Sequence, residues 1–273
     1  MIPLKAGSFK LSCSLKKIHS NQAHLIVHTL TEAERTTKKH ISMQIIALDP
    51  RQPEQDFPHV DSALRDPNGL LAIGGCLSRR RLLNAYRQGI FPWYNPDEPI
   101  LWWSPNPRLI LFPDQLIISR SLKKTLRRNA FVVTFDQAFQ EVITACADLR
   151  KESTGTWITP DINQAYTDLH KAGYAHSAEA WLNGQLVGGL YGVALGQVFF
   201  GESMFHITTD ASKVVFAQLA EQLKRWGYQL IDCQVHTTHL ASFGAINCPR
   251  TEFRHLLDKY CDLAPSPSAW HSK

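Results

Sequence analysis

A carboxylate and a carboxamide stand two residues apart at the end of an apolar run. Residues two apart in a strand point to the same face, so the pattern predicts that Asp232 and Gln234 lie side by side. A second apolar run, Phe199–Phe205, carries a single acid, Glu202. Two apolar strands that each hold an acid near one end indicate an apolar pocket with a few placed polar groups. Such a lining is typical of a small-ligand or catalytic site.

Other reactive side chains form weaker patterns. Cys233, His236 and His239 have spacings that a metal site could use, but no fourth ligand is close in sequence. The chain contains no phosphate-binding P-loop, no G-x-S-x-G nucleophile elbow and no H-E-x-x-H zinc motif. We therefore expect neither a metal nor a cofactor.

The charge of the chain is unevenly distributed. Its 273 residues, 44% hydrophobic and 19% charged, are those of a globular protein with one large domain or two ordinary ones. The net charge is +5, and residues 1–42, with seven basic and two acidic side chains, carry all of it. The remainder is neutral overall, so the basic isoelectric point is no argument for nucleic-acid binding.

Residues 1–42 also lack the continuous apolar stretch of a signal peptide. We interpret them as a basic, disordered extension, with a basic arm for RNA as the alternative. The six cysteines show neither a C-x-x-C pair nor a disulfide framework, and no apolar run reaches the roughly 18 residues that could span a membrane. The sequence therefore predicts a cytoplasmic protein with reduced thiols.

The periodicity of the chain changes near residue 175. Before it, helices are predicted after Ser78, after Asp136 and after Thr159, where a capping residue precedes an apolar stripe. After it, Asn183-Gly184 is a two-residue hairpin turn, and a last helix is predicted at 251–261. The segments between are three strands, a helix and a fourth strand, at 176–182, 185–195, 198–204, 210–226 and 229–234. The order β-β-β-α-β is that of a mixed sheet with a crossover helix.

One predicted helix, 119–128, has basic residues on a single face. They fall at i, i+3, i+4, i+7 and i+8: Arg120, Lys123, Lys124, Arg127 and Arg128. Leu122 and Leu126 take the other face, and no acid is present between Ser119 and Asn129. Because like charges so placed repel one another, we interpret this as a phosphate-binding face, with an ordinary solvated surface as the alternative.

Acetyl-CoA-dependent N-acetyltransferases also have the β-β-β-α-β order. They hold the pyrophosphate on backbone N–H groups of a glycine-rich loop before the helix. The corresponding loop here, 205–213, contains no glycine, and Asp210 places a carboxylate where the phosphates would lie. CoA binding is therefore not expected, although an N-acetyltransferase stays the first alternative function.

Seven stretches of the chain together resemble one known family. They are Pro67–Gly75, Gly89–Trp93, Leu101–Pro105, Gly155–Thr159, Gly188–Gly192, Gly201–Phe205 and Ile231–Gln234. In this order, over about 43–262, they resemble the bacterial leucyl/phenylalanyl-tRNA–protein transferases. The chain departs from the family pattern at Cys76 and at His236, to which the family assigns no chemistry.

The resemblance implies an α+β fold in two parts. A small N-terminal α/β domain is expected at 43–110. A C-terminal acetyltransferase-like mixed β-sheet domain is expected at 111–262, followed by a loose tail at 263–273.

The resemblance also implies a reaction. The family transfers leucine or phenylalanine, and methionine less well, from Leu-tRNA or Phe-tRNA to proteins with an N-terminal Arg or Lys, which marks them for degradation under the N-end rule. It assigns the catalytic role to Asp232 and Gln234 and suggests that Glu202 binds the acceptor. Trp93 and Trp157 are expected to stack on the 3′-terminal adenosine of the tRNA.

By the family's pattern, an apolar pocket takes the transferred side chain. It is lined by Leu190, Phe199, Gly201, Met204, Phe216, Leu219, Leu223 and Ile231. The members on helix 210–226 also form its core-facing stripe, so plain core is the alternative for part of this set. A non-catalytic RNA-binding protein is the second alternative function, and the acid–amide pair and the neutral body of the chain oppose it.

Overall fold

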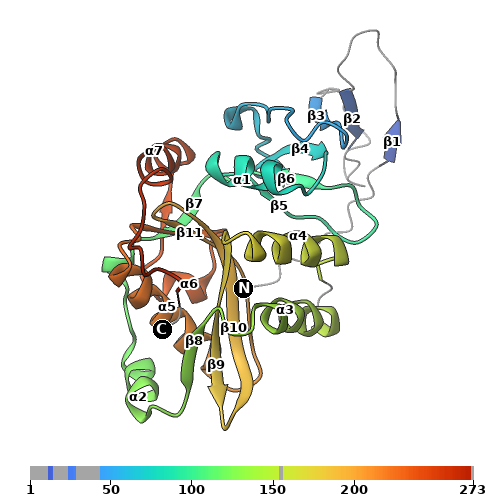
Figure 1. The fold of residues 1–273 in the computed structure, drawn as a ribbon. Helices are drawn as coiled ribbons and strands as arrows, with labels where there is room; N and C mark the ends of the chain where they lie inside the picture. Colours follow the sequence, from blue (N-terminus) through green and yellow to red (C-terminus); the bar gives the residue numbers. More distant parts are fainter. Residues whose placement is uncertain (1–11, 15–23, 29–43, 154–155, 272–273) are drawn as a thin grey trace, which may run out of the picture.

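The computed structural model describes residues 12–14, 24–28, 44–153 and 156–271. Their strands form two sheets, one of six strands and one of seven (Figure 1). Asn183 and Gly184, with φ of 52° and 77°, form the predicted hairpin turn between the first two long strands of the larger sheet. These strands and the elements that follow are β9 (Ala175–Leu182), β10 (Gln185–Leu195), β11 (Val198–His206), α5 (Ala211–Arg225) and β12 (Leu230–Gln234). β12 pairs with β11 in parallel, so the predicted β-β-β-α-β order is confirmed.

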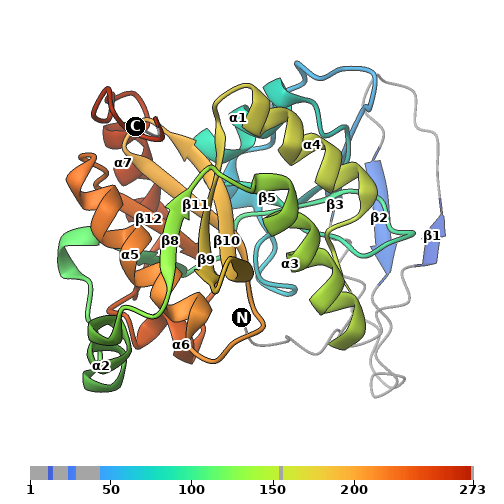
Figure 2. The same cartoon turned by 60° about the horizontal axis from the view of Figure 1, so that its bottom comes forward.

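The larger sheet has the order β13-β7-β12-β11-β10-β9-β8 and a hydrophobic core on each face. Its remaining strands are β7 (Arg108–Leu111), β8 (Val132–Phe135) and β13 (Ile246–Cys248). The helices α5, α2 (Arg120–Arg128) and α6 (Thr238–Ala241) contribute to one core, and α3 (Phe139–Ser153) and α4 (Pro160–Lys171) contribute to the other. Figure 2 shows α5 and α3 on opposite sides of the strands.

The smaller sheet has the order β1-β2-β3-β4-β6-β5 and shares the core of α3 and α4. Its strands are β1 (Ser12–Ser14), β2 (His24–His28), β3 (Gln44–Leu48), β4 (Leu70–Gly74), β5 (Phe91–Pro92) and β6 (Leu101–Trp103). The same core includes α1 (Arg79–Arg87) and the C-terminal α7 (Arg250–Tyr260). Short 3-10 helices are present at Val60–Ser62 and Pro113–Gln115.

Two predicted limits differ from the structure. Within the extension 1–42, Ser12–Ser14 and His24–His28 are strands, and β2 pairs with β3 at the edge of the smaller sheet. The apolar and largely β-branched run Leu25-Ile26-Val27 is a short strand signal, which the interpretation as a disordered extension did not use. The rest of 1–42 lies outside the described residues. The strand Arg108–Leu111 crosses the predicted division at 110 and belongs to the larger sheet.

A β-bulge isolates Glu202 on β11. Tyr191 pairs with Ser203 and Gly192 with Gly201, so Glu202 has no partner on β10. Such an extra residue changes which face the following side chains take. As a result, side chains on the two sides of the bulge do not follow one continuous alternation.

The ends of β11 and β12 separate beyond a short paired stretch. Their last paired residues are Phe200 and Asp232, although the strands continue to His206 and Gln234. The register of β12 against β7 also shifts between Asp232 and Gln234, where Gln234 has a positive φ of 61°. Irregularities on both strands therefore open the sheet at the level of the predicted site.

Capping side chains start three helices, at Ser78 and Thr159 as predicted and also at Ser119. Ser78, Ser119 and Thr159 each accept a hydrogen bond from the backbone N–H three residues on, at the starts of α1, α2 and α4. The prediction that Asp136 caps the next helix is wrong. Its carboxylate accepts the backbone N–H of Ser177 on β9 at 2.8 Å, a tertiary contact that local sequence does not reveal.

The C-terminal tail, predicted to be loose over 263–273, is docked on the larger sheet. Trp270 stacks on His176 with ring centroids 4.1 Å apart and contacts Trp226 at 4.8 Å. Its Nε1–H donates to the hydroxyl of Tyr228 at 2.8 Å. A single aromatic side chain holds the tail, and a single residue leaves no periodic pattern from which the docking could be predicted. Residues 272–273 lie outside the described part.

We expect Trp270→Ala to lower the free energy of unfolding by about 2–3 kcal/mol, because it removes a half-buried ring with several aromatic contacts. Trp93→Ala removes a ring that is 38% exposed and should cost about half as much or less. Urea denaturation of both variants measures the difference. Equal losses would show that the docked ring of Trp270 stabilises the protein no more than the exposed ring of Trp93 does.

Candidate active site

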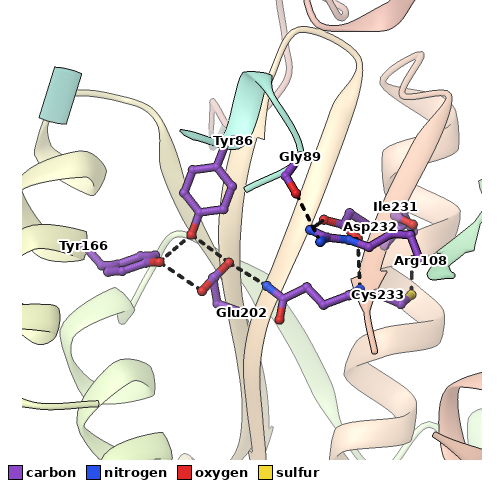
Figure 3. A network of polar contacts seen from close by, with 9 residues as sticks. Tyr86, Gly89, Arg108, Tyr166, Glu202, Ile231, Asp232 and Cys233 are labelled. Atoms are coloured by element: carbon purple, nitrogen blue, oxygen red, sulfur yellow. Dashed lines mark hydrogen bonds and ion pairs between the residues drawn. The ribbon is translucent and has the colours of Figure 1, made fainter. Parts of the chain in front are cut away.

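A buried ion pair joins Arg108, the first residue of β7, to Asp232 near the end of β12 (Figure 3). Arg108 Nε and Nη2 donate to Asp232 Oδ1 and Oδ2 at 2.8 and 2.6 Å. Arg108 Nη1 donates to the Gly89 carbonyl at 3.2 Å, and the rings of Phe91 and Phe253 lie 4.7 and 5.0 Å from the central carbon of the guanidinium. The bidentate geometry fixes Asp232 in one position and leaves its carboxylate closed to solvent.

Asp232 holds Gln234 through the main chain. Its Oδ1 accepts the backbone N–H of Gln234 at 2.9 Å, where the backbone has the left-handed φ of 61°. A residue other than glycine pays on the order of 1 kcal/mol or more for this conformation, so a fixed partner is needed to maintain it. The two predicted residues are thus in contact, by a bond from carboxylate to backbone rather than between their side chains.

Three donors converge on Glu202, which is only 2% exposed. Tyr86 donates its hydroxyl to Oε1 at 2.8 Å, Tyr166 donates to Oε2 at 3.0 Å, and the two hydroxyls contact each other. Gln234 Nε2 donates to Oε1 at 3.0 Å. Because β11, α1, α4 and β12 each supply one of these residues, the network joins the N-terminal part of the chain to the larger sheet.

Burial raises the pKa of Glu202 to about 7. The tyrosine hydrogen bonds and the charge of Arg108 lower it, and the nearby charge of Asp232 raises it further. Burial, together with the charge of Glu202, holds the pKa of Tyr86 and of Tyr166 well above the ordinary tyrosine value. Near neutral pH, therefore, Glu202 changes its charge while both tyrosines stay protonated.

The carboxamide of Gln234 is oriented by this network. Its Nε2 is engaged by Glu202, and among the described residues nothing donates to its Oε1. Gln234 is half-buried, so this oxygen is not closed off by the core. A carboxamide oxygen is too weak a base to remove a proton by itself, but it accepts a hydrogen bond from an amine and can hold that amine in place.

The predicted apolar pocket residues lie on the α5 side of the sheet. Six of them are buried in one cluster: Leu190, Phe199, Phe216, Leu219, Leu223 and Ile231. Met204 is half-buried against this cluster, and Gly201 precedes the bulge at Glu202. The structure therefore brings seven of the eight into one apolar group. Their role in binding a side chain stays a prediction.

Comparison with known proteins decides the family. The family model for leucyl/phenylalanyl-tRNA protein transferase matches residues 110–258, and that for its N-terminal domain matches 75–106. The leucyl/phenylalanyl-tRNA–protein transferase of Methylococcus capsulatus is 58% identical over 82% of this chain and 95% of its own. That of Azotobacter vinelandii is 58% identical over 78% of this chain and 94% of its own. This chain belongs to the leucyl/phenylalanyl-tRNA–protein transferase family.

As a member of this family the chain is an aminoacyltransferase, and its predicted tRNA-binding residues differ in exposure. Trp93 is 38% exposed and lies edge-on to Trp103, with centroids 5.7 Å apart. Trp157 is only 8% exposed and belongs to the core, so its ring offers little surface to a base. The five basic side chains of α2 are all exposed, and none forms an ion pair within the described residues.

Three residues of the site were not predicted from the sequence: Arg108, Tyr86 and Tyr166. The ring of Tyr86 belongs to the buried face of α1, and its hydroxyl donates to Glu202. Arg108 had a usable signal, because it opens the apolar strand Arg108–Leu111. A cation on a buried strand requires an acid nearby, and Asp232 lies on another such strand.

The alternatives to a transferase site have no further support here. Within the described ranges no three His, Cys, Asp or Glu side chains gather as metal ligands would, and burial raises the pKa of the Cys233 thiol. Asp210, at the start of α5, pairs with Lys213 Nζ at 2.7 Å, so a carboxylate occupies the helix end where CoA phosphates would bind. None of the helices in the described segments has the length and apolar character to cross a bilayer.

We expect Glu202→Gln to be more stable than the parent protein above pH 7 and to lose this advantage below about pH 5. The pKa of Glu202 is about 7 in the folded protein against an ordinary 4.5. Between these values the folded state binds more protons than the unfolded chain, so stability falls as pH rises. The full difference is on the order of 3 kcal/mol.

Chemical denaturation of both proteins from pH 4.5 to 8.5 measures this effect. Glutamine keeps one oxygen acceptor and replaces the other by an N–H donor, a change whose effect is the same at every pH, so the pH-dependent part of the difference isolates the charge. A stability difference that does not change with pH would contradict the assigned ionisation of Glu202.

Proposed function

We propose that this chain transfers leucine or phenylalanine, and methionine less well, from aminoacyl-tRNA to the α-amino group of a protein that begins with Arg or Lys. The new peptide bond marks that protein for degradation in the cytoplasm. The observation that carries the proposal is the oriented carboxamide of Gln234, with Nε2 held by Glu202 and Oε1 open to a ligand. The names of the relatives support the same aminoacyl-tRNA substrates.

The proposed reaction is the aminolysis of an ester. The acceptor nitrogen attacks the carbonyl carbon of the aminoacyl ester, a C–N bond forms, and the bond between that carbon and the tRNA 3′ oxygen breaks. The amine gives up one proton and the leaving 3′ oxygen gains one. With a pKa of about 7.7–8.0, roughly a tenth to a fifth of α-amino groups are neutral at pH 7. Because the ester is already activated, no covalent enzyme intermediate is needed.

Gln234 would hold the acceptor amine against the ester. Its Oε1 accepts a hydrogen bond from the amine, which directs the nitrogen lone pair toward the carbonyl carbon. Positioning of this kind contributes up to about 7–11 kcal/mol to catalysis. The proton then passes to the tRNA 3′ oxygen directly or through water, since the carboxamide does not keep it.

The two acids support Gln234 in different ways. Glu202 was expected to bind the acceptor, but three donors occupy its oxygens and it is almost fully buried, which favours a positioning role. Asp232 was expected to act catalytically, and its contacts with Arg108 and with the Gln234 backbone likewise favour positioning. The acid–amide constellation thus holds the reactants, and the chemistry comes from the activated ester.

Other groups would bind the rest of the aminoacyl-tRNA. The apolar cluster under α5, with Met204 at its margin, is suited to a leucine or phenylalanine side chain. Trp93 presents an exposed aromatic ring to the 3′-terminal adenosine. The basic face of α2 would contact acceptor-stem phosphates.

We expect Gln234→Ala to lower kcat by about 100-fold or more, with little change in tRNA affinity, because the carboxamide acts in the reacting complex. The assay offers labelled Leu-tRNA or Phe-tRNA and a peptide that begins with Arg, and follows label into the peptide. Gln229→Ala, just before the same strand, is the matched control and should retain activity. Turnover of Gln234→Ala close to that of the control would reject the orienting role.

We expect the double variant Arg127→Gln, Arg128→Gln to bind every aminoacyl-tRNA more weakly, whatever amino acid it carries. The slope of log K for tRNA binding against log salt concentration should also decrease in magnitude by up to about two, because fewer counterions are released. The pair Lys224→Gln, Arg225→Gln, at the exposed end of α5, removes the same charge and is the control. Identical slopes for both double variants would make α2 an ordinary solvated surface.

A further inference from the structure

An open cavity of about 510 Å³ lies where the N-terminal part of the chain meets the start of α7. Its polar lining comes from three separate segments: Asp61, Arg65, Asn68, Asn106 and Arg250. The reaction proposed above uses none of these residues. Two of the family-like stretches, Pro67–Gly75 and Leu101–Pro105, contribute or adjoin this lining and also have no part in that reaction.

The rim of the cavity is fixed by hydrogen bonds and close packing. Asn68 Nδ2 donates to the Asn106 carbonyl at 3.0 Å, and the Asn106 N–H donates to Asn68 Oδ1 at 3.1 Å. Asn106 Oδ1 also accepts the backbone N–H of Arg250, the first residue of α7, at 3.1 Å. At Gly69, with φ of 95°, a Cβ would lie 2.5 Å from Pro105 N, so the two loops meet with no space for a side chain. The cavity is therefore a built feature rather than a gap between mobile loops.

Arg250 gives the cavity a buried positive charge. The residue is 7% exposed, its Nη1 donates to the Val60 carbonyl at 2.7 Å, and its Nε has no hydrogen-bond partner. The N-terminus of α7, which adds a partial positive charge, and the exposed guanidinium of Arg65 lie at the same cavity. Two arginines that line one cavity favour an anionic ligand.

Asp61 makes the cavity unsuitable for a simple anion. Its carboxylate lines the same space and lies 3.5 Å from His59 Nδ1. Two guanidiniums and one carboxylate together match a ligand that carries both an anion and a hydroxyl donor. The ribose-phosphate backbone of RNA has this combination, since its 2′-hydroxyl can donate a hydrogen bond to a carboxylate.

The cavity lies at the same end of the sheet as Gln234. In the pairing of β13 with β7, Cys248 is opposite Arg108, which binds Asp232. Asn106 and Arg250 each lie two residues along the chain from this pair. The segment from Trp103 to Arg108 thus leads from the tryptophan pair that includes the exposed Trp93, past the cavity, to Arg108, which supports Asp232 and Gln234.

We propose that this cavity binds a ribose-phosphate unit in the single-stranded 3′ end of the aminoacyl-tRNA. Arg65 and Arg250 would contact the phosphate, and Asp61 would accept the ribose 2′-hydroxyl. The inference rests on the proposed function, because it takes aminoacyl-tRNA as the substrate. The site would hold the strand just before its terminal adenosine, so that the ester meets Gln234.

The first test compares Arg65→Gln with Arg51→Gln, an exposed arginine that does not line the cavity. Arg65→Gln should raise the Kd for aminoacyl-tRNA about three- to tenfold and reduce the salt slope by about one. For Arg65→Gln we also expect kcat/KM to fall by a similar factor on aminoacyl-tRNA relative to a small substrate, an aminoacyl ester of adenosine without phosphates. Arg65 is used because loss of the buried Arg250 could unfold the protein.

The second test concerns the 2′-hydroxyl. The parent protein should bind tRNA with 2′-deoxyribose in the nucleotides before the terminal adenosine about three- to tenfold more weakly than unmodified tRNA. Asp61→Ala should bind both tRNAs equally, and Asp56→Ala, outside the cavity, should keep the difference.

Several results would overturn the inference. Equal behaviour of Arg65→Gln and Arg51→Gln would show that no phosphate is bound there. An increased KM for the acceptor peptide with unchanged tRNA affinity would assign the cavity to the acceptor protein instead. Because tRNA binding is measured directly, a parent protein that binds tRNA but transfers nothing would reject the proposed function and not this site.

Discussion

The buried pair of Arg108 and Asp232 is the contact on which the geometry of the site depends. Arg108 is held by a backbone carbonyl before β5 and by aromatic rings from β5 and α7, so the pair ties the N-terminal part of the chain and the C-terminal helix to β12. Loss of one partner from such a pair typically costs about 3–5 kcal/mol, because a charge stays buried without compensation. Because of this cost, the two residues stay paired in the folded protein and the Asp232 carboxylate keeps one position. It can therefore hold the backbone N–H of Gln234 and maintain the unfavourable positive φ of that residue.

The two faces of the larger sheet contribute different groups to the proposed reaction, and the bulge at Glu202 determines which face each side chain of β11 takes. On one face Glu202 meets the two tyrosines, while on the other an apolar cluster packs under α5. A regular β11 would alternate strictly, and Met204 would share the face of Glu202. Because the strands also part beyond Phe200 and Asp232, a ligand between them would meet polar groups and apolar groups together.

The protonation of Glu202 links this geometry to pH. As a carboxylate it accepts hydrogen bonds from both tyrosines and from Gln234 Nε2, and in the proposed reaction the amide Oε1 then binds the acceptor amine. With its pKa raised to about 7, part of the population is protonated in neutral solution, and a protonated acid has one acceptor site fewer for these donors. The amide orientation that the proposed reaction requires is therefore favoured on the alkaline side, where the acceptor amine also loses its proton.

Local patterns in the sequence determined the strand order, the hairpin at Asn183-Gly184 and the caps at Ser78, Ser119 and Thr159, because each depends on residues a few positions apart. The same patterns identified Asp232, Gln234 and Glu202 as polar residues on apolar strands. Tertiary structure alone decided their partners: Arg108 is 124 residues from Asp232, and Tyr86 is 116 residues from Glu202. It also buried Trp157 and docked Trp270. Such contacts leave no period in the sequence, since a buried charge or hydroxyl specifies only that some partner must exist, and the packing of distant elements selects which one.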